Sequence, residues 1–190
     1  MNCLWVVMVV LEQKPYVINM QIGVIGPYGD LGCEEDLKKI AERIGELLAE
    51  RKVTVICGGD DKEGIIDAVA KGVKRKNGLV VGFITGIDKT KASRYNDIII
   101  PSGMFYGGRE YLLTLACDSI ILINGGSGTL NEITVAYQND IPMVSLKDSG
   151  SWASRLSNRY LDKRKRILIM GAKTPEEAVN LSIRLAKDKK

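Results

Sequence analysis

Short apolar segments alternate with longer amphipathic segments from Met20 onward. The apolar segments are rich in β-branched residues and predict buried strands at 21–25, 53–57, 79–83, 98–100, 119–123, 141–145 and 167–170. Between them, apolar residues recur at the spacing of one helix face. This pattern predicts helices over about 33–50, 65–73 and 109–116, after the glycines at 125–128, and from Thr174 to the end. Thr174-Pro175-Glu176-Glu177 predicts a capping box at the start of the last helix, with Pro175 at the first helical position.

Strands this apolar, separated by helices, predict a parallel sheet that is covered on both faces and joined by right-handed crossovers. We therefore expect an α/β fold with a doubly wound parallel sheet in three layers. A length of 190 residues fits one domain, and no linker or repeat interrupts the pattern. We assign residues 20–190 to a single domain.

Residues 1–19 stand apart from this pattern. The apolar run from Leu4 to Leu11 is too short to span a bilayer and lacks the basic start of a signal peptide. Met20 directly precedes the first strand. We expect an atypical extension, which either comes from an upstream start codon or adds an edge strand.

Composition narrows the possible chemistry. The chain contains no histidine, which excludes Ser-His-Asp and Cys-His catalysis and histidine metal sites. Acid–base chemistry would have to use carboxylates, Lys, Tyr, Cys or water, and we expect no metal site. The cysteines (Cys3, Cys33, Cys57 and Cys117) are scattered, which is typical of free thiols in a reducing compartment and favours the cytoplasm. A net charge of +4 favours anionic ligands only weakly.

The glycine-rich segment from Asn124 to Glu132 is the strongest local signal. Glycines allow close backbone approach to a ligand, and the helix that follows offers free N–H groups to a phosphate. Thr129 and Glu132 also fit a capping box, which would make Glu132 a residue that only starts the helix. The glycine clusters that begin at Gly26, Gly58 and Gly125 should meet at the carboxyl edge of the sheet and form one site. The Walker A pattern is absent and the dinucleotide fingerprint is poor.

Five motifs in this order resemble the Lonely Guy superfamily, which includes molybdenum-cofactor carriers and was long mislabelled as lysine decarboxylases. The motifs are Gly26-Pro27-Tyr28-Gly29, Cys57-Gly58-Gly59, the segment 64–72, Ser102-Gly103-Met104 with Arg109, and the segment 125–132. The resemblance implies a Rossmann-like fold, a homodimer and a nucleotide site at the strand edge. The enzymes of this superfamily are phosphoribohydrolases that release the base from a nucleoside 5′-monophosphate.

The resemblance also implies site residues. Arg109 and Glu132 match the catalytic positions. The ligand- and phosphate-binding positions are Gly26, Tyr28, Gly58, Gly59, Met104, Gly125, Gly126, Ser127, Gly128 and Thr129. Asn124 replaces the proline of the enzymatic signature, and Gly107 with Gly108 lengthens the approach to Arg109. The overall pattern of the sequence resembles the carrier branch more than the cytokinin-activating enzymes.

Two hypotheses remain open. In the first, Glu132 stabilises an oxocarbenium-like transition state or activates water, Arg109 orients the substrate, and no cofactor is required. In the second, the same glycine-rich site holds a nucleotide or the molybdenum cofactor without turnover. Either way the partner is a small phosphorylated ligand, with Tyr28 and Tyr106 as candidates to stack on a base. We expect no membrane association. The basic run 163–166 is more typical of a solvated surface than of nucleic-acid binding.

Overall fold

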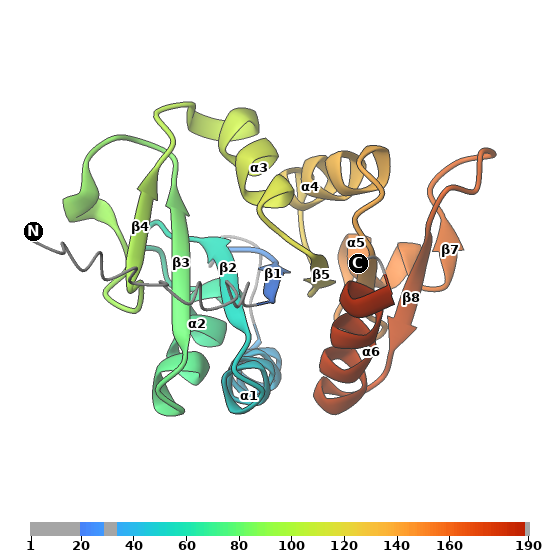
Figure 1. Ribbon diagram of the computed structural model, residues 1–190, viewed down its shortest axis with the longest axis horizontal. Coiled ribbons are helices and arrows are strands. Elements are labelled where there is room, and N and C mark those ends of the chain that lie inside the picture. The colour runs from blue at the N-terminus through green and yellow to red at the C-terminus, as the bar shows by residue number, and fades with distance from the viewer. Residues whose placement is uncertain (1–19, 29–33, 189–190) are drawn as a thin grey trace, which may run out of the picture.

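The computed structural model describes residues 20–28 and 34–188, which form one central sheet with helices on both faces (Figure 1). The strands are β1 (Gln21–Ile25), β2 (Thr54–Gly58), β3 (Leu79–Ile84), β4 (Ile98–Pro101), β5 (Ser119–Leu122), β6 (Met143–Leu146), β7 (Arg159–Tyr160) and β8 (Leu168–Ala172). Their order is β4-β3-β2-β1-β5-β6-β8-β7. Each pair is parallel except the β7–β8 pair, which is antiparallel.

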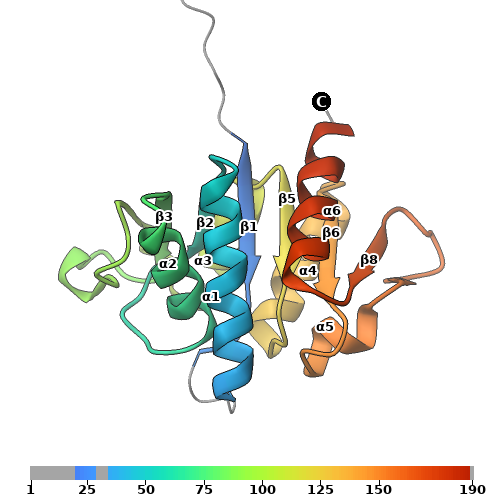
Figure 2. The ribbon, with the colours of Figure 1, turned by 90° about the horizontal axis from the view of Figure 1, so that it is seen from below.

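The helices form two layers. On one face lie α1 (Glu35–Glu50), α2 (Ile65–Arg75) and α6 (Pro175–Asp188), which are seen in front of the sheet in Figure 2. On the other face lie α3 (Phe105–Leu115), α4 (Ser127–Gln138) and the short α5 (Ser151–Leu156). The three-layer, doubly wound α/β fold predicted from the sequence is confirmed.

The sheet has a buried core on each face. Successive strand residues point to opposite faces, so Ile121 joins the cluster under α1, α2 and α6 while Ile120 and Leu122 join the cluster under α3, α4 and α5. All three side chains are fully buried. The continuous apolar runs in the sequence arise because both sheet faces are covered.

The connectivity reverses beside β1. The chain first runs outward from β1 through β2 and β3 to β4, and then returns so that β5 pairs with the other side of β1. The carboxyl ends of β1 and β5 therefore flank a topological switch point, which is where ligands bind in open α/β sheets.

The predicted element boundaries differ from the structure in a few places. The helix predicted at 109–116 extends back to Phe105 through a kink, at which Tyr106 and Gly107 leave helical geometry. The pattern did not predict β7 or α5, which are two and six residues long and too short to show a clear period. Residues 1–19 lie outside the described part of the chain.

The residues predicted as a capping box start the terminal helix, with the second hydrogen bond shifted by one residue to Lys173. The hydroxyl of Thr174 accepts a hydrogen bond from the backbone N–H of Glu177 at 3.1 Å, and the Glu177 carboxylate accepts one from the N–H of Lys173 at 2.7 Å. Pro175 is the first residue of α6, as predicted. Within residues 20–28 and 34–188, no helix is long and apolar enough to cross a membrane.

Candidate functional site

A cavity of about 190 Å³ lies at the switch point. Its walls come from the end of β1 and the residues after it, the end of β2, the start of α3 and the first turn of α4. The predicted site residues that line it are Gly26, Tyr28, Gly58, Arg109, Gly126, Ser127, Gly128, Thr129 and Glu132. The three glycine clusters thus meet at one edge, as the sequence predicted.

Three predicted binding residues lie outside the lining of this cavity: Gly59, Met104 and Gly125. Gly59 packs against the neighbouring strand, where an added Cβ would lie 2.6 Å from the carbonyl carbon of Gly82. Met104 is half exposed and immediately precedes α3. Gly125 has a φ of +107°, which glycine adopts without strain, and it sets the turn that leads into α4.

Arg109 is the buried centre of the site. Its Nη1 donates hydrogen bonds to the hydroxyl of Tyr28 at 3.2 Å and to the carbonyl of Phe83 at 3.4 Å. Its Nη2 pairs with the carboxylate of Glu110 at 3.1 Å, and both side chains are about 5% exposed. The Nε of Arg109 is buried and has no hydrogen-bond partner among the described residues. A buried donor in that state has unused capacity for an anionic ligand.

The electrostatics of Arg109 and Tyr28 follow from this contact. Burial opposes the charge on Arg109, but the oxygen of Tyr28 and the carboxyl of Glu132 outweigh it and raise the pKa of the guanidinium. Burial also raises the pKa of the Tyr28 phenol to about 12, against the opposing effect of Arg109. Arg109 therefore stays charged and Tyr28 stays neutral at physiological pH.

Glu132 lines the cavity from the second turn of α4 and is only 6% exposed. Burial raises the pKa of its carboxyl to about 8, the charge of Arg109 lowers it, and the charge of Glu110 raises it further. At neutral pH the carboxyl is therefore mostly protonated. The alternative role of Glu132 as half of a capping box is wrong, because the N-cap of α4 is Gly126 and no side chain caps this helix.

The first turn of α4 forms part of the cavity wall, next to Glu110. The first helical hydrogen bond of α4 is from the N–H of Leu130 to the carbonyl of Gly126, at 3.0 Å. The N–H groups of Ser127, Gly128 and Thr129 lie before it, have no intrahelical acceptor and border the cavity. They carry the partial positive charge of the helix N-terminus, which favours a phosphate.

Asn124 holds the loop before α4 in a shape that proline cannot adopt. Its φ is +56°, a left-handed conformation that asparagine tolerates, whereas proline is fixed near −65°. Its N–H donates to the hydroxyl of Ser149 at 2.8 Å, and proline has no N–H to donate. The replacement of the signature proline by Asn124 is therefore matched by a different backbone at this position.

The sequence did not single out Glu110 or the segment around Ser149. Glu110 lines the cavity, pairs with Arg109 and accepts a hydrogen bond from the N–H of Gly107 at 2.5 Å. One signal for Glu110 was available in the sequence. It is an acidic residue directly after Arg109, at the start of an otherwise apolar helix. Ser149 follows β6 and supports the α4 loop from a distance of 25 positions in the sequence, so no local pattern indicated it.

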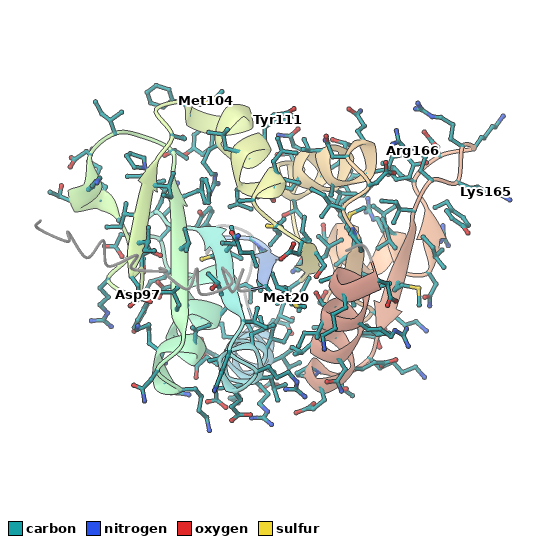
Figure 3. All side chains as sticks on the ribbon, in the orientation of Figure 1. Met20, Asp97, Met104, Tyr111, Lys165 and Arg166 are labelled. Atoms are coloured by element: carbon teal, nitrogen blue, oxygen red, sulfur yellow. The ribbon has the colours of Figure 1, made fainter. Side chains whose placement is uncertain are left out.

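Other candidate features have structural roles or remain outside the site. Cys57 and Cys117 are buried free thiols, as predicted, and burial raises the pKa of Cys57 to about 12. Among the described residues, no group of three or more Cys, Asp or Glu side chains could hold a metal ion. In the basic run, Arg164 pairs with Asp162 and Arg166 pairs with Asp140. Figure 3 shows Lys165 and Arg166 at the edge of the molecule, on the segment between β7 and β8.

The chain matches known proteins over most of its length. An uncharacterized protein from Archaeoglobus fulgidus is 36% identical over 167 residues, which cover 86% of this chain and 95% of that protein. The X-ray structure of TM1055 is 28% identical with a TM-score of 0.79, covering 87% of this chain and 99% of that chain.

A second solved structure carries a functional name. The molybdenum cofactor binding protein of the phototrophic bacterium Rippkaea orientalis is 25% identical with a TM-score of 0.77, and the match covers 89% of this chain and 98% of that chain. Residues 19–179 match the SLOG cluster4 family. Because this match spans the sheet, the cavity and most of the flanking helices, the chain belongs to the SLOG cluster4 family.

Proposed function

We propose that this protein binds a phosphorylated small molecule in the cavity at the switch point. The observation that carries the proposal is the buried Arg109, whose Nε has no partner among the described residues. Its side chain lines the same cavity as Ser127, Gly128 and Thr129, whose N–H groups have no acceptor within α4. A guanidinium and a helix N-terminus that share one cavity are well suited to a phosphate.

The size of the cavity indicates how such a ligand would lie. Its volume of about 190 Å³ is below the roughly 300–1,000 Å³ of pockets that enclose a drug-sized ligand. The phosphate and a sugar-sized portion would fill it, and a larger ring would extend outward. Tyr106 lines the cavity and is 72% exposed, so it would meet such a ring at the mouth.

The first role that we propose is that of a carrier, which holds its ligand without turnover. The solved structure from Rippkaea orientalis is named a molybdenum cofactor binding protein. We propose a phosphorylated pterin as the ligand of such a carrier, because its phosphate would meet the first turn of α4 and Arg109. The pKa of about 8 at Glu132 supports this role, because a protonated carboxyl is a poor base for activating water. The left-handed backbone at Asn124 also separates this loop from the proline-containing enzymatic signature.

The second candidate is a phosphoribohydrolase acting on a nucleoside 5′-monophosphate. The observation in its favour is that Glu132 and Arg109 line one cavity. A protonated Glu132 could act as a general acid that donates a proton to the departing base. As the bond between the base and the sugar breaks, water would attack the same sugar carbon and pass its proton to the Glu132 carboxylate, and the products would be the free base and ribose 5-phosphate.

We also propose a homodimer. The outer side of α3 exposes a group of apolar side chains, namely Phe105, Tyr111, Leu112 and Leu115, which are between 37% and 69% exposed. Apolar groups gathered on one helix are typical of an interaction surface. Light scattering after gel filtration should give twice the mass of one chain for the wild-type protein. For Leu115→Glu, the measured mass should fall to the mass of one chain.

One experiment separates the two roles. The protein is titrated with AMP, GMP and a phosphorylated pterin by calorimetry, and each mixture is then incubated and separated by chromatography. Binding without products supports the carrier, whereas free base that disappears in Glu132→Gln supports the hydrolase. Glu50→Gln is a matched control at the exposed end of α1. If no phosphorylated ligand binds, the proposed function is wrong.

A further inference from the structure

Lys62 reaches over the mouth of the cavity. It lies in the loop between β2 and α2, and its Nζ is 5.2 Å from the ring centre of Tyr28 and 5.4 Å from the ring centre of Tyr106. The same Nζ donates a hydrogen bond to the hydroxyl of Tyr106 at 3.1 Å. Both tyrosines line the cavity, so the ammonium group lies beside its wall, although Lys62 is not itself a lining residue.

No carboxylate among the described residues forms an ion pair with Lys62. Cation–π contacts with the two rings hold its ammonium group in place. An ammonium group has three N–H donors and no acceptor. One of its donors reaches Tyr106, so the others are available to an acceptor on a ligand.

Tyr106 is held in position although its side chain is largely exposed. The kink at Gly107, with a φ of +90°, turns the chain so that Tyr106 precedes the regular part of α3. The N–H of Gly107 donates to Glu110 at 2.5 Å, and its carbonyl accepts from the side-chain amide of Asn131 at 3.2 Å. The kink therefore links the position of Tyr106 to two residues beside the phosphate cradle.

We propose that Lys62, Tyr28 and Tyr106 form a subsite that selects a planar ring bearing an oxo group. This inference rests on the proposed function, because the ring must belong to a ligand whose phosphate occupies the cavity. Tyr106 stacks on the ring, and Lys62 donates a hydrogen bond to the oxo group. An amino group at the same ring position would point its N–H donors at the N–H donors of Lys62, so a ring with an amino group there should bind more weakly. Guanine, hypoxanthine and pterin rings belong to the preferred class, and adenine does not.

Inosine and adenosine monophosphates test the subsite directly, because they differ at one ring position, where an oxo group replaces an amino group. We expect the wild-type protein to bind IMP about fivefold more tightly than AMP, the effect of roughly one net hydrogen bond. Lys62→Met should remove this preference mainly by weakening IMP. Lys187→Met, which removes an exposed lysine from α6, should leave it intact.

The tyrosine is tested separately. Tyr106→Ala should weaken both nucleotides roughly tenfold through lost stacking, whereas Tyr106→Phe should keep most of the affinity for each. The subsite is wrong if IMP and AMP bind equally to the wild-type protein, or if Lys62→Met weakens both by the same factor. If neither nucleotide binds, inorganic phosphate is titrated. Binding of phosphate alone overturns the subsite, and failure to bind phosphate overturns the proposed function as well.

Discussion

Arg109 donates a hydrogen bond to the hydroxyl of Tyr28 at 3.2 Å and so joins the helix before β5 to the loop after β1. The contact passes over Gly58, the last residue of β2. A Cβ at Gly58 would collide with both the Tyr28 hydroxyl and Nη1 of Arg109. Gly58 therefore serves the site by leaving room for two side chains that line the cavity.

Gly58→Ala should displace Arg109 and Tyr28 together. We expect the free energy of unfolding to fall by about 1–3 kcal/mol, as for other overpacked sites, and phosphate binding to weaken. Urea unfolding and calorimetry would measure these effects. Gly86→Ala is the control, since its Cβ would meet nothing closer than 4.0 Å. Wild-type stability and binding in Gly58→Ala would contradict this account of the contact.

Arg109 and Glu110 should be strongly coupled, because each is about 5% exposed and they form an ion pair at 3.1 Å. Arg109→Met leaves the Glu110 carboxylate buried without its partner and should cost about 3–5 kcal/mol of stability. The free energy of unfolding lost in the double variant Arg109→Met, Glu110→Gln should be clearly smaller than the sum of the losses in the two single variants. Additive losses in a double-mutant cycle would show that the pair is not coupled.

Glu132 should make stability depend on pH. Its pKa in the folded protein is about 8, above its ordinary value of 4.5, so the folded state retains a proton that the unfolded state releases. The stabilisation is complete below about pH 4.5 and is lost as pH rises to about 8, with a slope of up to ~1.4 kcal/mol per pH unit. Glu132→Gln lacks this titration and should become progressively more stable than the wild type between pH 5.5 and 8.5.

The control for that pH series is Glu50→Gln. The pKa of Glu50 is lowered by its hydrogen bond to Lys76, so this carboxyl does not titrate in the same pH window. Glu50→Gln should keep the wild-type slope. A wild-type slope in Glu132→Gln as well would mean that another group causes the pH dependence.

Most of the fold could be predicted because buried parallel strands appear in a sequence as continuous apolar runs. The run at 119–123, for example, corresponds to β5, whose four residues are all buried. The strand β7 has two exposed residues, Arg159 and Tyr160, and its pairing with β8 depends on a contact that no local pattern encodes. Its short length and exposure explain why the sequence did not indicate it.

The site could be predicted only in part. The glycine clusters and the order of the motifs indicated Arg109, Glu132 and the first turn of α4. Glycines mark places where the backbone can approach a ligand closely, and charged side chains can be read directly from the sequence. The ion pair of Glu110 and the support from Ser149 depend on tertiary packing. Gly59 is the opposite case. The motif predicts that it binds the ligand, but a Cβ added at Gly59 would have its closest contacts with Gly82 and Asn96.

Asn124 should tolerate glycine but not proline. Asn124→Pro forces φ away from +56° and removes the N–H that donates to Ser149, so we expect a loss of about 3 kcal/mol or more. Asn124→Gly keeps both the conformation and the N–H and should change stability by less than about 1 kcal/mol. Thermal unfolding compares the two variants. A stable Asn124→Pro protein would show that the loop accepts the backbone of the enzymatic signature.

The phosphate cradle is tested most directly at Gly128. Among the described residues, a Cβ at this position would meet no atom closer than the Glu110 carboxylate at 3.8 Å, so alanine fits the fold while its methyl group narrows the phosphate site. Alanine also favours a helix over glycine by about 1 kcal/mol. The measurement is a calorimetric titration of wild-type protein, Gly128→Ala and Gly86→Ala with IMP. We expect at least about tenfold weaker binding of IMP in Gly128→Ala alone, a loss of roughly 1.4 kcal/mol of binding free energy, with no loss of stability. Equal affinity in all three proteins would contradict a phosphate bound at the start of α4.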